Sequence, residues 1–308
     1  MKSISNFNNS DNLELFAKQI VEGFITGLHK SPYHGFSVEF SEHRLYNPGE
    51  NTKNIDWKLF ARTDKLFSKR YEEETNLRCQ LIIDSSSSMY HPNYLNANLE
   101  NPNKILFSIY ASAILINLLK RQRDAVGISF FNEKLDLHTQ CRTTSKHHQL
   151  LYKELDKLLS INPIEKSKKT FSIEPLHQIS KILNKRSLVM IFSDMISDKE
   201  SLDEQFGAFK HFKHNKHEVI LFYLIDGKTE LDFEYDNKPY KFIDSETSEE
   251  ININPNQIKE NYKQRMNKHI NDLKLKCLQY KIDFVKVDIS LDFNQVLNSY
   301  FIKRKKIL

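Results

Sequence analysis

Three oxygen-bearing side chains directly follow a strongly apolar segment. Asp84, Ser86 and Ser88 occupy alternate positions after the apolar run that ends at residue 83. We expect this run to be a buried strand, because it stops abruptly at a polar loop. In such a loop the three side chains can face one point, and oxygen-only ligands suit Mg²⁺, Mn²⁺ or Ca²⁺. The spacing favours a divalent-cation site, and a serine-rich turn that caps the next helix is the alternative.

The pattern Asp-x-Ser-x-Ser after an apolar strand resembles the metal-ion-dependent adhesion site of von Willebrand factor A-type domains. In that family a threonine from a later loop and an aspartate at the end of a later strand complete the site. The resemblance assigns these places to Thr170, which precedes a predicted helix, and to Asp194, which follows the apolar run 187–193. Lysines stand at positions 168 and 169, where the family usually has glycines. The ligand set that the resemblance implies is Asp84, Ser86, Ser88, Thr170 and Asp194.

A catalytic role for the same loop is the main alternative to cation-dependent binding. A phosphoryl-transfer site on a strand-end aspartate needs a second acid or base and a fixed lysine. Ser86 stands where phosphatases of the haloacid dehalogenase type, with their Asp-x-Asp signature, have that acid. The Gly-x-Ser-x-Gly turn of serine hydrolases is also absent from the sequence. We therefore expect a protein that is not an enzyme, and a metal-dependent phosphohydrolase is the alternative.

Composition and charge argue against several classes of ligand. The 308 residues are 39% hydrophobic and 28% charged, which is enough to bury the core of one large or two small domains. Neither Gly-x-Gly-x-x-Gly nor Gly-x-x-x-x-Gly-Lys occurs, so nucleotide binding is not expected. The net charge of +5 is spread over many lysines and predicts no specific contact with nucleic acid.

The cysteines and the apolar segments bear on the cellular compartment. The cysteines are far apart and form no Cys-x-x-Cys pair, so neither a disulfide framework nor a zinc ribbon is expected. The first 20 residues contain no unbroken apolar core of a signal peptide. The longest apolar stretch, residues 105–119, is shorter than the ~20 residues that cross a bilayer. We therefore expect a cytoplasmic protein with no membrane span.

The loop that carries Asp84 needs a sheet in which strand ends lie close together. Apolar strands alternate with helices along the chain, which indicates an α/β fold with an open, doubly wound and mostly parallel sheet. Ligands bind such sheets at the carboxyl ends of the strands, where Asp84 and Asp194 are expected. The predicted strands are residues 78–84, 125–131, 135–139, 187–193, 218–225 and 282–288, and the predicted helices are residues 104–123, 145–159, 171–183, 201–214, 255–280 and 292–301.

Two further regions extend this fold. An amphipathic helix at residues 12–28 and a β arm make up residues 1–76, which we expect to pack on a main domain of residues 77–308. Within the main domain, a hairpin insertion is expected at about residues 228–246. Its two strands are predicted at residues 231–235 and 240–243.

Several short motifs precede the Asp84 loop. They are Gly35-Phe36-Ser37-x-Glu39-Phe40, Arg44-x-Tyr46-x-Pro48-Gly49-Glu50, Ile55-Asp56-Trp57-Lys58 and Ala61-Arg62-Thr63, followed by Tyr71-Glu72. With these motifs the chain, from about residue 23 to its end, is similar to the bacterial family called domain of unknown function fifty-eight. Members of that family typically carry a von Willebrand A-like domain and are encoded beside MoxR-type AAA+ ATPases. Glu50 departs from the Gly-Asp that is common in the family's Pro-Gly turn.

Together the two resemblances imply a non-enzymatic, metal-dependent protein-binding module. A partner's Asp or Glu would replace a water molecule on the bound cation, so the contact would exist only when metal is present. The family resemblance further implies an adaptor or co-chaperone that presents client proteins to a MoxR-like AAA+ ATPase. A structural or oligomeric scaffold with an empty metal loop is the alternative, because the lysines before Thr170 depart from the family pattern.

Overall fold

The chain divides into two compact units. One comprises Met1–Phe24 together with Leu77–Leu308, and the other comprises Ile25–Asn76. The computed structural model describes residues 10–28, 42–45, 57–70, 77–93, 96–160, 173–196, 202–243 and 249–307. Within these residues, no helix combines the length and the apolar character that a membrane span requires.

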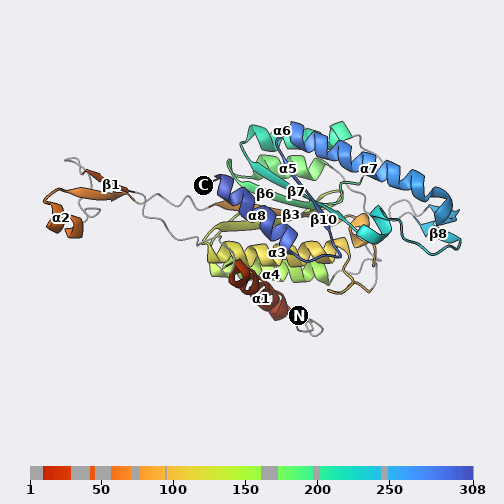
Figure 1. Cartoon of the computed structure of the whole chain (residues 1–308), viewed down its shortest axis with the longest axis horizontal. Helices are drawn as coiled ribbons and strands as arrows, with labels where there is room; N and C mark the ends of the chain where they lie inside the picture. Colours follow the sequence, from red (N-terminus) through yellow and green to blue (C-terminus); the bar gives the residue numbers. More distant parts are fainter. Residues whose placement is uncertain are drawn as a thin grey trace. The chain divides into compact units, whose positions relative to one another are not determined.

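A central sheet organises the larger unit (Figure 1). Within the described residues it has six strands in the order β10-β7-β6-β3-β4-β5. All neighbouring strands are parallel except β5, which runs antiparallel to β4 at one edge. The predicted open, mostly parallel sheet is confirmed. The strands are β3 (Arg78–Asp84), β4 (Ala125–Phe131), β5 (Leu135–His138), β6 (Leu188–Ser193), β7 (Glu218–Ile225) and β10 (Asp283–Asp288).

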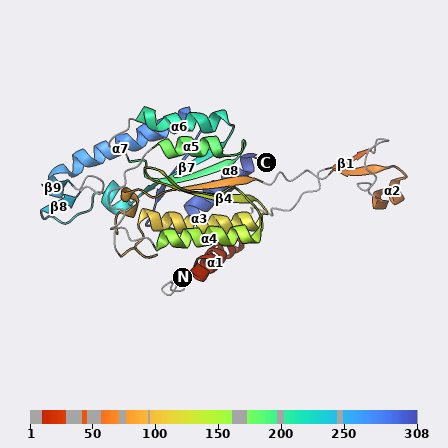
Figure 2. The same ribbon diagram turned by 180° about the vertical axis from the view of Figure 1, so that it is seen from behind.

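Helices cover both faces of this sheet (Figures 1 and 2). On one face, Ile82, Val189 and Leu221 from three neighbouring strands pack in one buried cluster with residues of α5, α6 and α7. On the other face lie α3 and α4, and the stacked rings of Phe107 and Phe293, 4.8 Å apart, join α3 to the start of α8. The helices are α1 (Ser10–Leu28), α3 (Lys104–Arg121), α4 (Ser145–Leu159), α5 (Glu174–Ile182), α6 (Leu202–His214), α7 (Pro255–Gln279) and α8 (Asn294–Ile307).

The sequence of the inner strands explains why they lie at the centre. All seven residues of β4 are buried, as are all six of β6 and every residue of β3 after Arg78. A strand covered by helices on both faces requires such a continuous apolar run, whereas an edge strand tolerates alternation. The antiparallel edge strand β5 accordingly has no fully buried residue.

The strand order creates a switch point between β3 and β6. From β3 the chain passes through α3 to β4 on one side, and it later returns to form β6 on the other side. Helices that leave neighbouring strand ends on opposite faces open a crevice at the carboxyl edge of the sheet, and ligands of open α/β sheets bind there. Asp84 ends β3 and Asp194 directly follows β6, so both residues lie at this crevice.

A hairpin follows β7, but it does not have the strands or the bounds that were predicted for the insertion. The segment after β7 forms a short π-helical turn, η4 (Gly227–Leu231), and the strand predicted at residues 231–235 does not form. Instead, β8 (Tyr240–Ile243) pairs antiparallel with β9 (Glu250–Ile253). The cause is local capping, because the Asp226 side chain accepts hydrogen bonds from the backbone N–H and the hydroxyl of Thr229 and so stabilises the turn.

The smaller unit contains a second hairpin. Its strand β1 (Glu42–Leu45) pairs antiparallel with β2 (Phe67–Arg70), and the helix α2 (Trp57–Thr63) lies between them in the chain. The predicted boundary at residue 76 agrees with the division, but α1 as far as Phe24 belongs to the larger unit instead of to the arm. Residues 29–41 of the predicted arm lie outside the described residues. That the arm packs on the main domain stays a prediction.

Gly127 in β4 marks a close approach between neighbouring segments. A Cβ atom at this position would lie 2.5 Å from the Gln80 Oε1 atom and 2.6 Å from the Thr139 carbonyl oxygen. Because the carbonyl belongs to the backbone and cannot rotate away, we expect Gly127→Ala to lower the free energy of unfolding by about 1–3 kcal/mol, the usual effect of overpacking. Urea denaturation of Gly23→Ala, where a Cβ meets nothing within 4 Å, provides the control. Equal losses in the two variants would contradict this account.

Candidate metal centre

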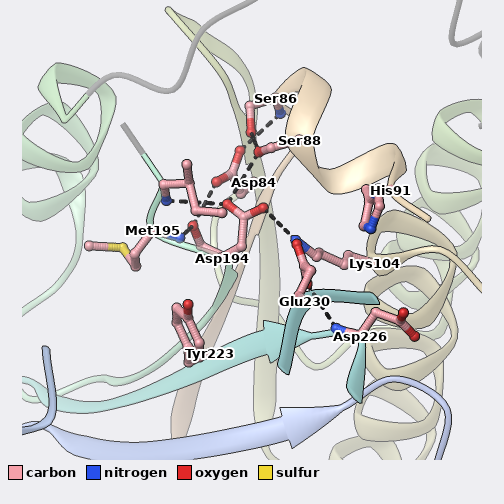
Figure 3. Close-up of polar contacts among 12 residues, drawn as sticks. Asp84, Ser86, Ser88, His91, Lys104, Asp194, Met195, Tyr223, Asp226 and Glu230 are labelled. Atoms are coloured by element: carbon pink, nitrogen blue, oxygen red, sulfur yellow. Dashed lines mark hydrogen bonds and ion pairs between the residues drawn. The ribbon is translucent and has the colours of Figure 1, made fainter. Parts of the chain in front are cut away.

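Asp84 is a fully buried carboxyl of the candidate site, at the end of β3 (Figure 3). Its Oδ1 atom accepts the Ser86 backbone N–H at 2.9 Å, and its Oδ2 atom accepts the Ser193 hydroxyl at 2.6 Å. Burial, followed by the nearby Asp194 carboxylate, raises the pKa of Asp84 to about 7, although the hydrogen bonds that it accepts oppose this shift. The environment therefore disfavours a second negative charge beside Asp194 unless a cation is near.

Two serine hydroxyls connect the loop after β3 to the end of β6. The Ser86 and Ser88 hydroxyl oxygens are 3.2 Å apart, and Ser88 donates a hydrogen bond to Asp194 Oδ1 at 3.2 Å. The short 3₁₀ helix η2 (Ser87–Tyr90) turns the backbone here, so that side chains two residues apart meet. Figure 3 shows the four side chains pointing toward one another from two loops.

The structure thus brings together four of the five residues predicted as metal ligands. These are Asp84, Ser86, Ser88 and Asp194. Thr170 lies outside the described residues. The role of all five as ligands stays a prediction.

Lys104 is a member of this cluster that the sequence did not identify. Its ammonium group donates hydrogen bonds to Asp194 Oδ2 at 2.9 Å and to Glu230 Oε1 at 2.6 Å. The Lys104 side chain is 1% exposed and that of Asp194 is 0% exposed. Burial alone would lower the pKa of Lys104, but the two carboxylates raise it above its usual range, so the amine is charged.

A weak signal for Lys104 is present in the sequence. The residue opens α3 directly after Asn103, whose side chain caps the helix by accepting the Leu106 backbone N–H at 2.9 Å. The first turn of a helix disfavours a cation, because the helix dipole is positive at that end. A lone lysine at the start of an otherwise apolar helix is therefore a reason to look for acidic partners.

Glu230 comes from the turn η4 and has no counterpart among the predicted ligands. Its second carboxylate oxygen, Oε2, accepts the Asp226 backbone N–H at 2.8 Å. The turn is also tied to the loop after β3, because His91 Nε2 and the Thr229 hydroxyl are 2.8 Å apart. The backbone N–H of Lys104 donates a hydrogen bond to the His91 carbonyl at 3.2 Å. One polar network thus holds together the loop after β3, the loop after β6 and the turn η4.

The donor set of this cluster suits a hard divalent cation. Asp84 and Asp194 supply carboxylate oxygens, and Ser86 and Ser88 supply hydroxyl oxygens, which are the ligand types that Mg²⁺, Mn²⁺ and Ca²⁺ prefer. Among the described residues, no three His, Cys, Asp or Glu side chains are grouped so as to hold a metal ion. A cation in this crevice would therefore depend on the two serine hydroxyls as well as the carboxylates.

Two solved structures are similar to this chain at low sequence identity. The BatB protein from Bacteroides thetaiotaomicron is 15% identical, with 75% of this chain and 100% of that chain covered and a TM-score of 0.43. An aerotolerance-related membrane protein from Bacteroides fragilis is also 15% identical, with 74% and 99% covered and a TM-score of 0.44.

Relatives in sequence include bacterial proteins that match over a shorter span. Uncharacterized protein Mb1516 of Mycobacterium bovis and uncharacterized protein Rv1480 of Mycobacterium tuberculosis are each 34% identical to this chain over 77 residues. The match covers 25% of this chain and 24% of each relative, so it spans about a quarter of their length. The family described as Protein of unknown function DUF58 matches a far longer segment, residues 42–272. This chain belongs to the DUF58 family.

Proposed function

We propose that this protein is a non-enzymatic binding module that uses a divalent cation to hold an acidic side chain of a partner protein. The observation that carries the proposal is the meeting of Asp84, Ser86, Ser88 and Asp194 in one hydrogen-bonded cluster at the switch point of the sheet. The von Willebrand A-like reading of the fold supports it, because the open parallel sheet is consistent with that architecture.

The charge balance of the cluster suits this role. Two carboxylates offset the charge of a divalent ion, whereas the serine hydroxyls coordinate without adding charge. Thr170 is the fifth ligand in the proposed set, from the resemblance to the adhesion site. Coordination positions that the protein leaves to water would then be open to an external carboxylate, and a charge-assisted contact of this kind requires the metal.

We further propose that the partner is a MoxR-type AAA+ ATPase, for which this protein acts as an adaptor that presents clients. This part of the proposal rests on membership of the DUF58 family and on the gene arrangement that the family resemblance implies. The acidic side chain that completes the cation's coordination would belong either to the ATPase or to a client protein.

A metal-free scaffold is the second candidate, and one observation favours it. In the described residues, Asp194 already pairs with Lys104, an ammonium that it shares with Glu230, and both oxygens of Asp84 accept hydrogen bonds. A site whose carboxylates are satisfied in this way does not need an ion in order to fold. Binding of Mg²⁺ by the isolated protein therefore distinguishes the two candidates.

The experiment that tests the proposed function is a binding assay with and without metal. Immobilised wild type and the double variant Asp84→Ala, Ser86→Ala are incubated with a purified MoxR-type ATPase, and separately with lysate, in Mg²⁺ or in EDTA. We expect retention only by wild type in Mg²⁺. Asp236→Ala, which removes a carboxylate of a side chain that is 77% exposed, is the matched control and should bind like wild type. Identical recovery from all samples would contradict metal-dependent binding.

A further inference from the structure

Lys104 contacts one of the two carboxylates on which the proposed cation depends. Its ammonium lies 2.9 Å from Asp194 Oδ2, while Asp194 Oδ1 accepts the Ser88 hydroxyl. Figure 3 shows Lys104 reaching one oxygen of the Asp194 carboxylate and Ser88 reaching the other, with Glu230 beside Lys104. A positive charge therefore already occupies one edge of the proposed metal site.

Stability alone does not explain why this lysine is buried here. A buried ion pair loses the hydration of both charges, and replacing such a pair with apolar residues is often neutral or stabilising. The position at the start of α3 adds a further penalty from the helix dipole. An apolar side chain would suit the surrounding core, in which the next residues of α3 are all buried. These considerations favour a role for the charge itself.

Lys104 has a second carboxylate to which it can shift. Its distance to Glu230 Oε1 is 2.6 Å, and Glu230 is held in place through the Asp226 backbone N–H at 2.8 Å. The ammonium can therefore leave Asp194 without losing its countercharge. Because Glu230 belongs to η4, such a shift would also alter the contacts of that turn.

We propose that Lys104 is a built-in cation that competes with the divalent ion for Asp194, and that Glu230 receives the ammonium when the ion binds. This inference rests on the metal site of the proposed function. Lys104 offsets part of the negative charge of the metal-free site, and the competition lowers the affinity for metal. The η4 turn then responds to occupation of the site, because it carries Glu230.

Manganese titration calorimetry of the full chain tests this competition. Lys104→Met removes the charge but keeps the length of the side chain. We expect it to bind Mn²⁺ at least about tenfold more tightly than wild type, since the ammonium lies a few ångströms from the site of a divalent cation and repels it. Glu230→Gln has the opposite effect, because the ammonium then has only Asp194 to pair with. Its affinity for Mn²⁺ should fall by at least about fivefold.

The double variant Lys104→Met, Glu230→Gln separates competition from net charge. It removes one positive and one negative charge, so the formal charge of the site is the same as in wild type. Only Asp194 then lacks its ammonium partner, so the double variant also serves if Lys104→Met alone does not fold. Tighter Mn²⁺ binding by the double variant than by wild type supports direct competition for Asp194. If wild type binds no measurable Mn²⁺ but Lys104→Met or the double variant does, that result also supports direct competition for Asp194.

The outcomes that overturn the inference are distinct from those that overturn the proposed function. If wild type, Lys104→Met and the double variant bind Mn²⁺ with equal affinity, the competition is wrong and the metal site stands. If neither wild type nor any of the variants binds Mn²⁺ in a titration under the same conditions, the metal site is wrong, and the proposed function and the inference both fail.

Discussion

Replacing Asp84 with Asn is expected to lower the affinity for Mg²⁺ or Mn²⁺ by at least about a hundredfold, because loss of a ligand exceeds the 10- to 100-fold effect typical of outer-shell partners. Asn keeps the size of the side chain and one oxygen that can accept the Ser86 N–H, which is 2.9 Å away. The variant therefore removes a charge with little change of shape. Titration calorimetry on the full chain measures the affinity directly.

Ser193→Ala is a control for which we expect a smaller loss of metal affinity than for Asp84→Asn. Ser193 donates to Asp84 Oδ2 at 2.6 Å but is not among the proposed ligands, so its loss should weaken metal binding by only about tenfold. Circular dichroism of both variants confirms that the fold is retained. Metal affinity that is unchanged in Asp84→Asn would show that this carboxylate is not a ligand.

Lys104→Met is expected to lower the free energy of unfolding of the metal-free protein by about 3–5 kcal/mol, the usual effect of removing one partner from a buried ion pair. The substitution leaves the Asp194 and Glu230 carboxylates without the ammonium that both contact. Urea denaturation in EDTA measures the loss. Added Mn²⁺ should restore part of it, since a bound cation stabilises the folded state to which it binds.

Lys120→Met is a matched control on the same helix. Lys120 pairs with Glu14 at 2.8 Å, but the two side chains are 38% and 40% exposed, so solvent screens the interaction. We expect this variant to lose at most about 0.5 kcal/mol, as is typical of exposed ion pairs. Similar losses in Lys104→Met and Lys120→Met would contradict the structural importance assigned to the buried ammonium.

The parts of the fold that could be predicted are those in which sequence pattern and burial coincide. The runs that became β3, β6 and β7 are apolar over most of their length, as a strand covered on both faces requires. The Asn254 cap and Pro255 likewise mark the start of α7 where the structure has it. The residues that end β3 and follow β6 were therefore expected at one edge of the sheet.

The segment after β7 could not be predicted because its local pattern is ambiguous. Residues 231–235 alternate between apolar and charged side chains as a strand does. Their conformation is decided instead by Asp226, which accepts two hydrogen bonds from Thr229, and by Glu230, which accepts the Asp226 N–H. Such side-chain contacts compete with strand pairing and leave no periodic signal in the sequence.

The charged part of the candidate site depends on long-range contacts that spacing does not encode. Lys104 and Glu230 are 126 positions apart in the chain, and Lys104 and Asp194 are 90 apart. The sequence gives the types of these residues but not which carboxylate a given lysine meets. The ligand candidates after β3 were easier to identify, because alternate positions in one loop suffice to bring their oxygens together.

Anomalous diffraction from crystals grown with Mn²⁺ is the most direct test of the metal centre. This metal centre should give a single strong peak within coordination distance of the side-chain oxygens of Asp84, Ser86, Ser88 and Asp194, with the Lys104 ammonium moved from Asp194 onto Glu230. An absence of any peak in this crevice at saturating Mn²⁺, with Lys104 still paired to Asp194, would contradict it.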